Sequence, residues 1–322
     1  MNALAKPALS AAHETAAVSA DRIALRAGDF SFEVAEVAFR AGAWTAIVGP
    51  NGSGKTTLVE ALLGFRAARM DNVRILGVPG ARFMADTAQL RRLGAQLQRV
   101  EYADWLRVDE IVDVHRALYR RQSPIVAGAL GLDELAKKPY DGLSKGQRQR
   151  LDLFVAMAHE PELLILDEPF TGLDKTYAGR VLELLTGALR GATVIMICHA
   201  GEELAAASDV LWVHQGGVKY QGSRAALKDR LVGRYRTLIH VESPAQEAEL
   251  RGRLAADRSV LRVIAGREPL QIEAYGGEGL DAVVRALMDS AHLRHFELAP
   301  ATDSDLLRIC TQAGAITGAI DA

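Results

Sequence analysis

The residues best suited to chemistry in this sequence form one glycine-rich segment, Gly49-Pro50-Asn51-Gly52-Ser53-Gly54-Lys55-Thr56-Thr57. Its glycines can adopt backbone conformations that other residues avoid, so the chain can fold tightly around an anion with its N–H groups turned inward. A lysine and a hydroxyl residue after the last glycine add a cation for the β- and γ-phosphates and a ligand for Mg²⁺. The pattern predicts a nucleoside triphosphate site in which Lys55 contacts the phosphates and Thr56 holds the metal, and in which the other nucleotide contacts are Asn51, Gly52, Ser53, Gly54 and Thr57.

The elements on either side of this segment have the order that such a site requires. Trp44–Val48 is an apolar run that predicts a buried strand, and residues 58–64 predict a helix closed by a glycine. Because strand, glycine-rich turn and helix follow one another, the N-terminus of the helix would face the bound phosphates.

A second group of candidate catalytic residues follows another apolar run. Residues 163–166 read Leu-Leu-Ile-Leu, which is typical of a central parallel strand, and the carboxylates Asp167 and Glu168 come next. Asp167 would take Mg²⁺, directly or through water, and Glu168 would polarise the attacking water as a general base. Two adjacent carboxylates after a strand also describe a solvated loop, but the phosphate-binding segment in the same chain favours the catalytic interpretation.

Composition excludes several classes of protein. The chain has 322 residues, 49% apolar and 24% charged, which indicates a soluble protein of about two domains. Its net charge of −2 is not the strongly basic charge typical of proteins that bind nucleic acid, so no nucleic acid partner is expected. Its two cysteines suit a reducing compartment. No apolar run approaches the roughly 18 residues of a membrane span. Residues 1–20 are rich in Ala and Ser and predict a flexible tail rather than a signal peptide.

The hydrophobic pattern divides the rest of the chain into two domains. Strands alternate with helices over residues 21–230, which predicts an α/β domain with a largely parallel sheet, and residues 99–152 predict a helical subdomain within it. Residues 85–93 are expected to be one helix and 95–98 a strand. Over residues 231–322 the predicted order is β-α-β-β-α-β, the arrangement of a ferredoxin-like α+β module.

Together these segments resemble the nucleotide-binding subunit of an ATP-binding cassette (ABC) transporter over about residues 21–227. Leu143-Ser144-Lys145-Gly146-Gln147 is similar to the family's signature sequence, Leu-Ser-Gly-Gly-Gln. The resemblance implies a P-loop NTPase fold with a RecA-like core and a helical subdomain. It also implies a dimer that holds two nucleotides, each between the phosphate loop of one subunit and the signature of the other. Contacts across that dimer would come from Ser144, Gly146 and Gln147.

The resemblance implies roles for three further residues. Gln98 falls where the family has a glutamine that contacts Mg²⁺ or the attacking water, although Gln96 on the same strand is a competitor. The sequence Gly172-Leu173-Asp174 matches the segment that crosses the dimer seam, which places Asp174 near the nucleotide. His199 follows another buried strand and matches the histidine that holds the γ-phosphate, so the expected catalytic residues are Glu168, His199 and Gln98.

Two positions depart from the family's pattern. Lys145 replaces the first glycine of the signature, as in exporter-type branches, and its side chain is expected to be solvated. The family stacks adenine on an aromatic residue where this chain has Arg26 or Ala27. Phe30 or Phe32 could take that role, or Arg26 could lie across the base.

These features predict an ATPase subunit, dependent on ATP and Mg²⁺, that works as a homodimer or heterodimer and powers a separately encoded transmembrane permease. It would lie in the cytoplasm, peripheral on the membrane face. The resemblance favours an exporter of drug, antibiotic or lipid-like substrates. The alternatives are an importer and a non-transport ABC ATPase acting on nucleic acid or ribosomes. Tyr102, Trp105 and Leu106 are candidates for the permease contact, although Trp105 could equally pack inside the helical subdomain.

Overall fold

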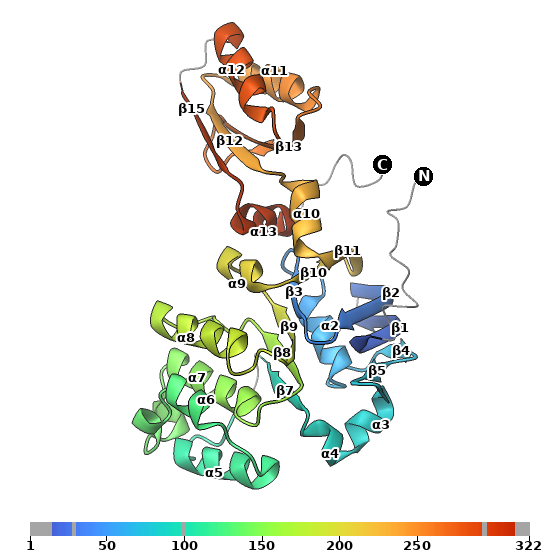
Figure 1. Cartoon of the computed structure of the whole chain (residues 1–322), viewed down its shortest axis with the longest axis vertical. Coiled ribbons are helices and arrows are strands. Elements are labelled where there is room, and N and C mark those ends of the chain that lie inside the picture. The colour runs from blue at the N-terminus through green and yellow to red at the C-terminus, as the bar shows by residue number, and fades with distance from the viewer. Residues whose placement is uncertain (1–14, 28–29, 98–100, 292–294, 313–322) are drawn as a thin grey trace. The chain divides into compact units, whose positions relative to one another are not determined.

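A computed structural model describes residues 15–27, 30–97, 101–291 and 295–312 (Figure 1). The chain divides into two compact units. We call residues 15–199 with 211–221 the N-terminal unit, and residues 200–210 with 222–312 the C-terminal unit. Within the described ranges, no helix combines the length and apolar character needed to cross a membrane.

A six-stranded sheet forms the centre of the N-terminal unit, in the order β11-β10-β3-β9-β8-β7. Neighbours among β3, β9, β8 and β7 pair in parallel. Every residue of β3, β8 and β9 is buried, as expected for continuous apolar runs that are covered on both faces. The strands are β3 Trp44–Val48, β7 Leu93–Gln96, β8 Leu163–Asp167, β9 Thr193–Ile197, β10 Asp209–His214 and β11 Gly217–Ser223.

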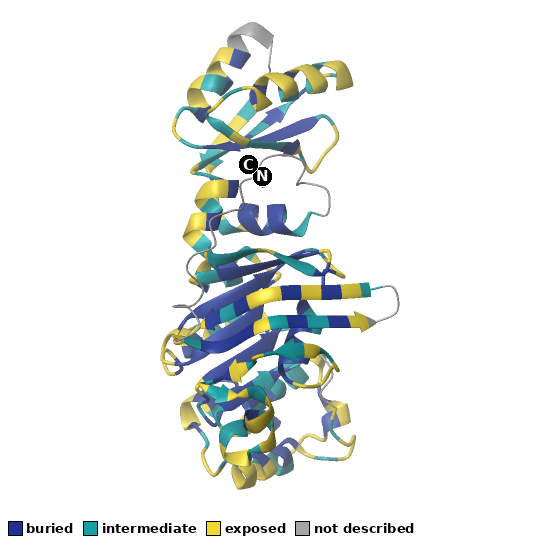
Figure 2. Ribbon diagram, turned by 90° about the vertical axis from the view of Figure 1, so that its right-hand side faces the viewer, coloured by how far each residue is buried: buried dark blue, intermediate teal, exposed yellow. Residues whose placement is uncertain are grey.

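A second, antiparallel sheet contains an N-terminal hairpin formed by β1 and β2. Its strands are β1 Ala16–Ala27, β2 Phe30–Arg40, β4 Arg69–Asp71, β5 Arg74–Ile75 and β6 Val78–Pro79. Figure 2 shows buried and exposed residues alternating along the hairpin, the pattern of strands with one covered face.

The prediction of a flexible tail over residues 1–20 is wrong for the last residues of that range, because β1 begins at Ala16. Val18 pairs with Phe39 on one side and with Ile75 on the other. The small side chains that suggested a tail are buried here: Val18 is 1% exposed and Ala20 is 0% exposed. Low side-chain bulk is compatible with a strand packed between two others.

One predicted helix of the N-terminal unit, residues 85–93, is divided into two in the structure. Asp86 divides the expected helix 85–93, because its extended backbone ends α3 and its carboxylate caps α4, accepting from the N–H of Ala88 at 2.8 Å. A left-handed residue, Arg120 with φ 57°, ends α5, and Pro124 starts α6. The helices are α2 Lys55–Leu62, α3 Gly80–Ala85, α4 Thr87–Leu90, α5 Val108–Tyr119, α6 Pro124–Ala129, α7 Lys145–Met157 and α8 Lys175–Thr186.

The C-terminal unit contains one antiparallel sheet, in the order β13-β14-β12-β15. Its elements follow the predicted β-α-β-β-α-β order, and buried apolar residues of β12, β14, α11 and α12 form its core. Two helices that precede the predicted boundary at residue 230, α9 and most of α10, group with this unit. Its elements are α9 Gly201–Ala206, α10 Arg224–Leu231, β12 Tyr235–His240, α11 Pro244–Ala255, β13 Val260–Ala265, β14 Gln271–Gly276, α12 Leu280–Ala291, β15 His295–Pro300 and α13 Asp303–Thr311.

Candidate functional site

The predicted site residues follow strands whose carboxyl ends lie at one edge of the central sheet. In the parallel register Ile47 of β3 lies opposite Ile197 of β9, and Ile197 lies opposite Asp167 of β8. The phosphate loop therefore starts beside the end of β9, and His199 follows β9 between the loop strand and the strand of the two carboxylates. Ligands of open α/β sheets bind at this edge.

The phosphate loop has the backbone that its glycines predict. Gly49, Gly52 and Gly54 have φ of 148°, 76° and 105°. At Gly54 the space is also restricted, because a Cβ there would lie 2.6 Å from Cδ2 of Phe32. Gly54 is the N-cap of α2, and the N–H of Leu58 donates back to its carbonyl at 2.9 Å. The loop therefore ends at a helix N-terminus whose N-cap residue supplies no side-chain hydrogen bond, and such a terminus can bind an anion.

Lys55 is buried, with 7% of its surface exposed, and its side chain turns back along the loop. Its Nζ donates to the carbonyls of Gly49 at 2.9 Å and Pro50 at 3.1 Å. Burial lowers the pKa of Lys55, and the nearby negative charges of Glu168 and Asp167 oppose that shift. The loop thus holds one cation close to both predicted catalytic carboxylates.

Asp167 is 1% exposed, and neither of its carboxylate oxygens has a hydrogen-bond partner among the residues that the structure describes. Burial raises the pKa of Asp167 to about 6; the Thr56 hydroxyl opposes the rise, although the geometry of that contact falls short of a hydrogen bond. No described residue is a hydrogen-bond partner of the buried Oγ of Ser53 either. Unpaired buried oxygens need an explanation, and a divalent cation with its phosphate ligand would satisfy them. The donor set therefore fits Mg²⁺ with a nucleotide.

Glu168 and His199, two of the three predicted catalytic residues, are in direct contact. Nε2 of His199 lies 2.9 Å from Oε1 of Glu168. Glu168 has φ 54°, a left-handed conformation that is strained for a residue with a side chain, and the N–H of Thr171 donates to its carbonyl at 3.1 Å. Such strain is concentrated at functional sites, where the surrounding structure holds a side chain in a required position. The contact of Glu168 with Thr171 was not foreseen in the sequence.

The signature residues form the N-terminus of α7. Ser144 caps this helix, with its Oγ accepting from the N–H of Gln147 at 3.3 Å, while Oε1 of Gln147 accepts from the N–H of Ser144 at 3.1 Å. Gly146 lies against the carbonyl of Gly172, which a Cβ would approach to 2.6 Å. Close packing therefore joins the signature to the segment that precedes α8.

Lys145 and Asp174 both make contacts in the segment that joins the signature to α8. The aliphatic stem of Lys145 lies 3.3 to 3.4 Å from the position of a Cβ on Gly172, so the side chain covers this glycine although Lys145 is exposed. Asp174 caps α8, accepting from the N–H of Tyr177 at 3.0 Å. Its carboxylate faces the backbone of its own helix.

Gln98 lies outside the described residues, whereas its competitor Gln96 ends β7 opposite Leu166. Gln96 is 3% exposed, and within the described part of the chain its Oε1 has no hydrogen-bond partner. Gln96 therefore places an unpaired acceptor opposite the residue that precedes Asp167 on the neighbouring strand. Sequence spacing alone favoured Gln98 and gave no signal for this unpaired acceptor.

The candidates for adenine stacking differ in their exposure. Phe32 is 0% exposed and belongs to the apolar core, so it offers no face to a base. Phe30 is partly buried beside Gly54, and Arg26 is exposed. Phe30 and Arg26 stay as the candidates, and residues 28 and 29 lie outside the described chain.

Comparison with known proteins decides the family. The family model described as ABC transporter matches residues 32–171. The chain is 30% identical over 218 residues to a Nod factor export ATP-binding protein I of Rhizobium leguminosarum bv. viciae, covering 64% of this chain and 67% of that protein. It is 32% identical over 267 residues to an Fe(3+) ions import ATP-binding protein of Mesorhizobium japonicum, covering 74% of this chain and 72% of that protein. The chain belongs to the ABC transporter ATP-binding family.

Solved structures agree with the fold of this ABC ATPase. An ATP-binding subunit of an ABC transporter matches with a TM-score of 0.58 at 22% identity, covering 66% of this chain and 91% of the other. A dimeric bacterial ABC transporter cassette matches with a TM-score of 0.55 at 19% identity, covering 64% and 98%. The predicted P-loop NTPase fold is confirmed, and the protein is an ATP-binding subunit that hydrolyses ATP in transport.

Proposed function

We propose that this ABC ATPase binds ATP with Mg²⁺ at the described sheet edge and hydrolyses it within a dimer. The observation that carries the proposal is the grouping of a buried Lys55 with Asp167, Glu168 and His199 at the ends of adjacent strands. Thr56 and Asp167 would hold the metal, together with Gln98 or Gln96. Magnesium-bound triphosphate supplies a polarised γ-phosphoryl group and neutralises the charge that develops during its transfer.

Each side chain of the site then has its own role in nucleotide binding or hydrolysis. Lys55 binds the phosphates as a cation, while the N–H groups of the loop and of α2 orient them. Glu168 orients and deprotonates the attacking water, and the contact of its Oε1 with Nε2 of His199 at 2.9 Å holds the carboxylate in place. The residues expected to reach the nucleotide in a second subunit are Ser144, Gly146, Gln147 and Asp174.

Replacing Lys55 by alanine tests the proposed nucleotide site. We expect Lys55→Ala to weaken ATP binding by at least about tenfold, or about 1.4 kcal/mol, because the charge that the loop holds is removed. The measurement is calorimetric titration of the purified chain with ATP and Mg²⁺. Lys219→Ala on β11 is the control, since that lysine is exposed. Equal affinity in the two variants would refute the assignment of the site.

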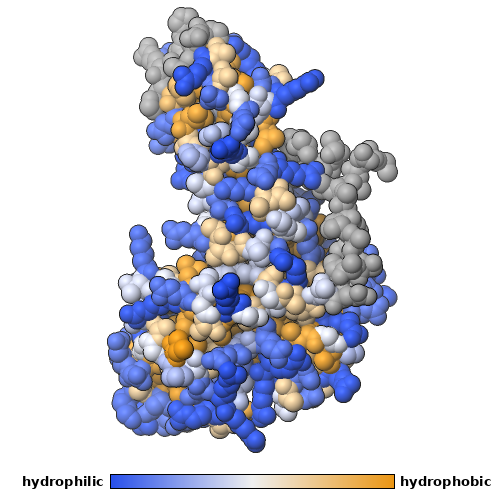
Figure 3. Space-filling view, in the orientation of Figure 1, coloured by the Kyte–Doolittle hydropathy of each residue, from blue (hydrophilic) through white to orange (hydrophobic). Residues whose placement is uncertain are grey.

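We propose a separately encoded membrane permease as the partner, which would hold this chain at the cytoplasmic face of the membrane. Trp105 is 74% exposed, and Val114, Leu118 and Ile125 on α5 and α6 are 56 to 62% exposed. Figure 3 shows apolar groups interrupting the polar surface of the N-terminal unit. The exposure of Trp105 supports its role in an interface, because large apolar side chains are enriched where proteins bind one another.

For the direction of transport we propose export. The lysine within the signature and the small C-terminal module support that direction, as does the similarity to a Nod factor export protein at 30% identity. Import is the second candidate, because a ferric ion import protein is 32% identical over a longer segment. Drug, antibiotic or lipid-like molecules are the proposed cargo class.

Purification of the tagged chain from detergent-solubilised membranes tests the partner and the direction. We expect a polytopic membrane protein to copurify without a substrate-binding protein. A complex that includes a substrate-binding protein would instead support import. Recovery of ribosomes or nucleic acid without a membrane protein would support the non-transport alternative.

A further inference from the structure

The turn that follows β8 holds Glu168 in an unusual backbone conformation. Glu168 has φ 54° and directly precedes Pro169, a position at which the proline ring further restricts the backbone. The N–H of Thr171 donates to the carbonyl of Glu168 at 3.1 Å and closes the turn. Because a left-handed conformation costs energy in a residue with a side chain, the surrounding structure must hold this turn in place.

The two carboxylate oxygens of Glu168 have different partners. Oε1 lies 2.9 Å from Nε2 of His199, whereas Oε2 accepts from Oγ1 of Thr171 at 3.4 Å. Thr171 therefore contacts Glu168 through both its backbone and its side chain. The direction of the carboxylate depends on the position of the turn, because Thr171 is part of that turn.

One contact that holds the turn comes from α7, the helix that begins at the signature. Nε2 of Gln149 donates to the carbonyl of Pro169 at 2.7 Å. The accepting carbonyl belongs to the residue directly after Glu168, and both α7 and the turn lie in the N-terminal unit. Gln149 is partly buried and Pro169 is buried, so water competes less for this hydrogen bond than it would at the surface. Because a carbonyl oxygen only accepts, the contact requires a donor at position 149.

The face of α7 that carries Gln149 packs along the same segment at two further points. A Cβ on Gly146, three residues earlier, would lie 2.6 Å from the carbonyl oxygen of Gly172. The guanidinium of Arg150 lies 3.9 Å from the centre of the Tyr177 ring on α8, and Arg150 is 6% exposed. Residues three and four apart share one face of a helix. The hydrogen bond of Gln149 therefore starts from a helix whose position along this segment is fixed.

We infer that Gln149 is a positioning residue for Glu168. Its hydrogen bond from the signature helix fixes the backbone directly after Glu168, and so it holds the turn that directs the carboxylate to the attacking water. The inference rests on the proposed role of Glu168 as the general base. Loss of the hydrogen bond slows hydrolysis without weakening nucleotide binding, because the phosphate loop is a different segment of the chain.

Gln149→Met in the full-length protein tests the inference, because methionine has a similar length and shape but no donor. We expect kcat for ATP to fall about tenfold, since displacement of a catalytic group by about 1 Å has effects of this order or larger. KM for ATP should stay within about twofold, because Gln149 does not belong to the phosphate loop. Gln149→Lys keeps a donor and should restore part of the lost turnover.

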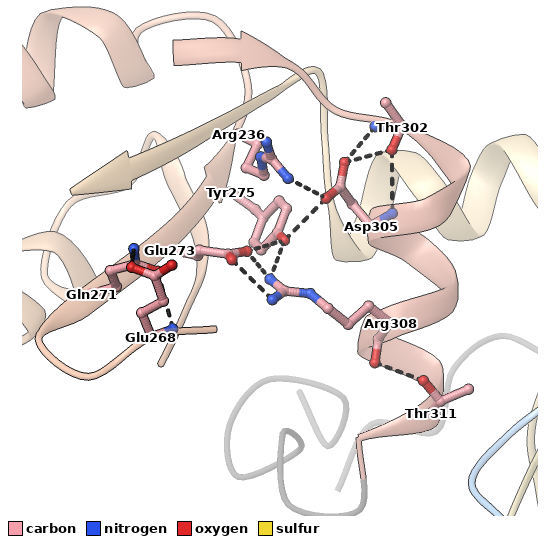
Figure 4. Close-up of polar contacts among 9 residues, drawn as sticks. All are labelled: Arg236, Glu268, Gln271, Glu273, Tyr275, Thr302, Asp305, Arg308 and Thr311. Atoms are coloured by element: carbon pink, nitrogen blue, oxygen red, sulfur yellow. Dashed lines mark hydrogen bonds and ion pairs between the residues drawn. The ribbon is translucent and has the colours of Figure 1, made fainter. Parts of the chain in front are cut away.

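Gln122→Met is the matched control. Nε2 of Gln122 donates to the carbonyl of Val112 at 2.7 Å, so this variant removes a hydrogen bond of the same kind and length within the N-terminal unit. Tyr275→Phe is a second control, in the C-terminal unit. It removes the hydroxyl that donates to Glu273 at 2.7 Å and accepts from Arg308 at 2.7 Å (Figure 4). Both variants should lower the free energy of unfolding and leave kcat unchanged.

Dimer formation separates the positioning of Glu168 from support of the signature. Gln149→Met combined with Glu168→Gln should still dimerise when ATP is added, because the signature and the phosphate loop are unchanged. A monomer in that double variant would assign Gln149 to the structure of the signature and overturn the inference.

Wild-type kcat in Gln149→Met would overturn the inference too, as would a rise in KM with unchanged kcat. An equal fall of kcat in either control would also overturn it, since turnover would then follow stability. If Glu168→Gln alone kept wild-type turnover, or stayed monomeric with ATP, the proposed function would fail instead.

Discussion

At the level of single residues, the two glycines that flank α2 are under different constraints. Gly54 before α2 and Gly64 after it both have positive φ, 105° and 74°. A Cβ would clash with Phe32 at Gly54, whereas at Gly64 no atom of the described residues lies within 4 Å of the Cβ position. Gly64 therefore shows the constraint of backbone conformation alone, whereas at Gly54 a neighbouring side chain also excludes a Cβ.

Replacing each glycine by alanine should show that difference. We expect Gly64→Ala to lower the free energy of unfolding by about 1 kcal/mol, the cost of a left-handed conformation for a residue with a side chain. Gly54→Ala should cost about 1 to 3 kcal/mol more, because Phe32 must move, and it should also weaken ATP binding. Urea denaturation and nucleotide titration measure both effects. Equal costs in the two variants would contradict the proposed contact.

At the level of elements, α5 and the end of α7 are joined by a buried aromatic stack. The ring of Tyr119 lies 4.5 Å from that of His115 and 3.9 Å from that of His159. Nε2 of His159 is 3.1 Å from the carbonyl of Leu93, while Nδ1 of His159 and Nε2 of His115 are buried with no hydrogen-bond partner in the described ranges. Burial lowers the pKa of both histidines to about 4, so both are neutral near pH 7.

Acidification should therefore destabilise the helical subdomain. Because the pKa in the folded state lies below the value of about 6.5 in the unfolded state, the unfolded chain binds more protons. The stabilisation is complete above pH 6.5 and is lost as the pH falls toward 4. Between pH 7.5 and pH 5 we expect a loss of about 2 to 4 kcal/mol, measured by urea denaturation.

The variant His115→Phe tests the source of that loss. It keeps an aromatic ring in the stack but removes one titrating group, so the decrease between pH 7.5 and pH 5 should become smaller. A decrease of unchanged size would assign the acid sensitivity to other groups.

At the level of the whole molecule, the proposed site needs a second subunit. Ser144 and Gln147 satisfy each other's backbone N–H groups, and Asp174 caps α8. The N-terminus of α7 nevertheless remains available to an anion from another molecule. A nucleotide held by the phosphate loop of one subunit would complete such a site in its partner.

Glu168→Gln should trap that dimer. The variant keeps the size of the side chain but loses the general base, so ATP and Mg²⁺ should bind without turnover. Light scattering should then show the mass rising from 34.7 kDa to twice that value with ATP but not with ADP. Lys55→Ala combined with Glu168→Gln is the control and should stay monomeric. A monomer in saturating ATP, or wild-type turnover, would refute the proposed role of Glu168.

Much of the fold and the site could be predicted from local signals. Gly54, Lys55 and Thr56 identify the phosphate loop because that turn needs those residue types in consecutive positions. The apolar run before Asp167 indicates a buried strand in the same way. Where long-range pairing decided the outcome, local signals failed: Ala16–Ala27 is a strand because β2 and β5 flank its first residues.

The sequence by itself determined which residues could bind a triphosphate and that each would follow a strand or begin a helix, because these depend on backbone conformation and side-chain type within a few residues. Only the tertiary structure decided that β9 lies between β3 and β8, which brings His199 to within 2.9 Å of Glu168. It alone assigned α9 to the C-terminal unit. Strand order and helix packing arise from contacts between segments far apart in the chain, which spacing along the sequence does not specify.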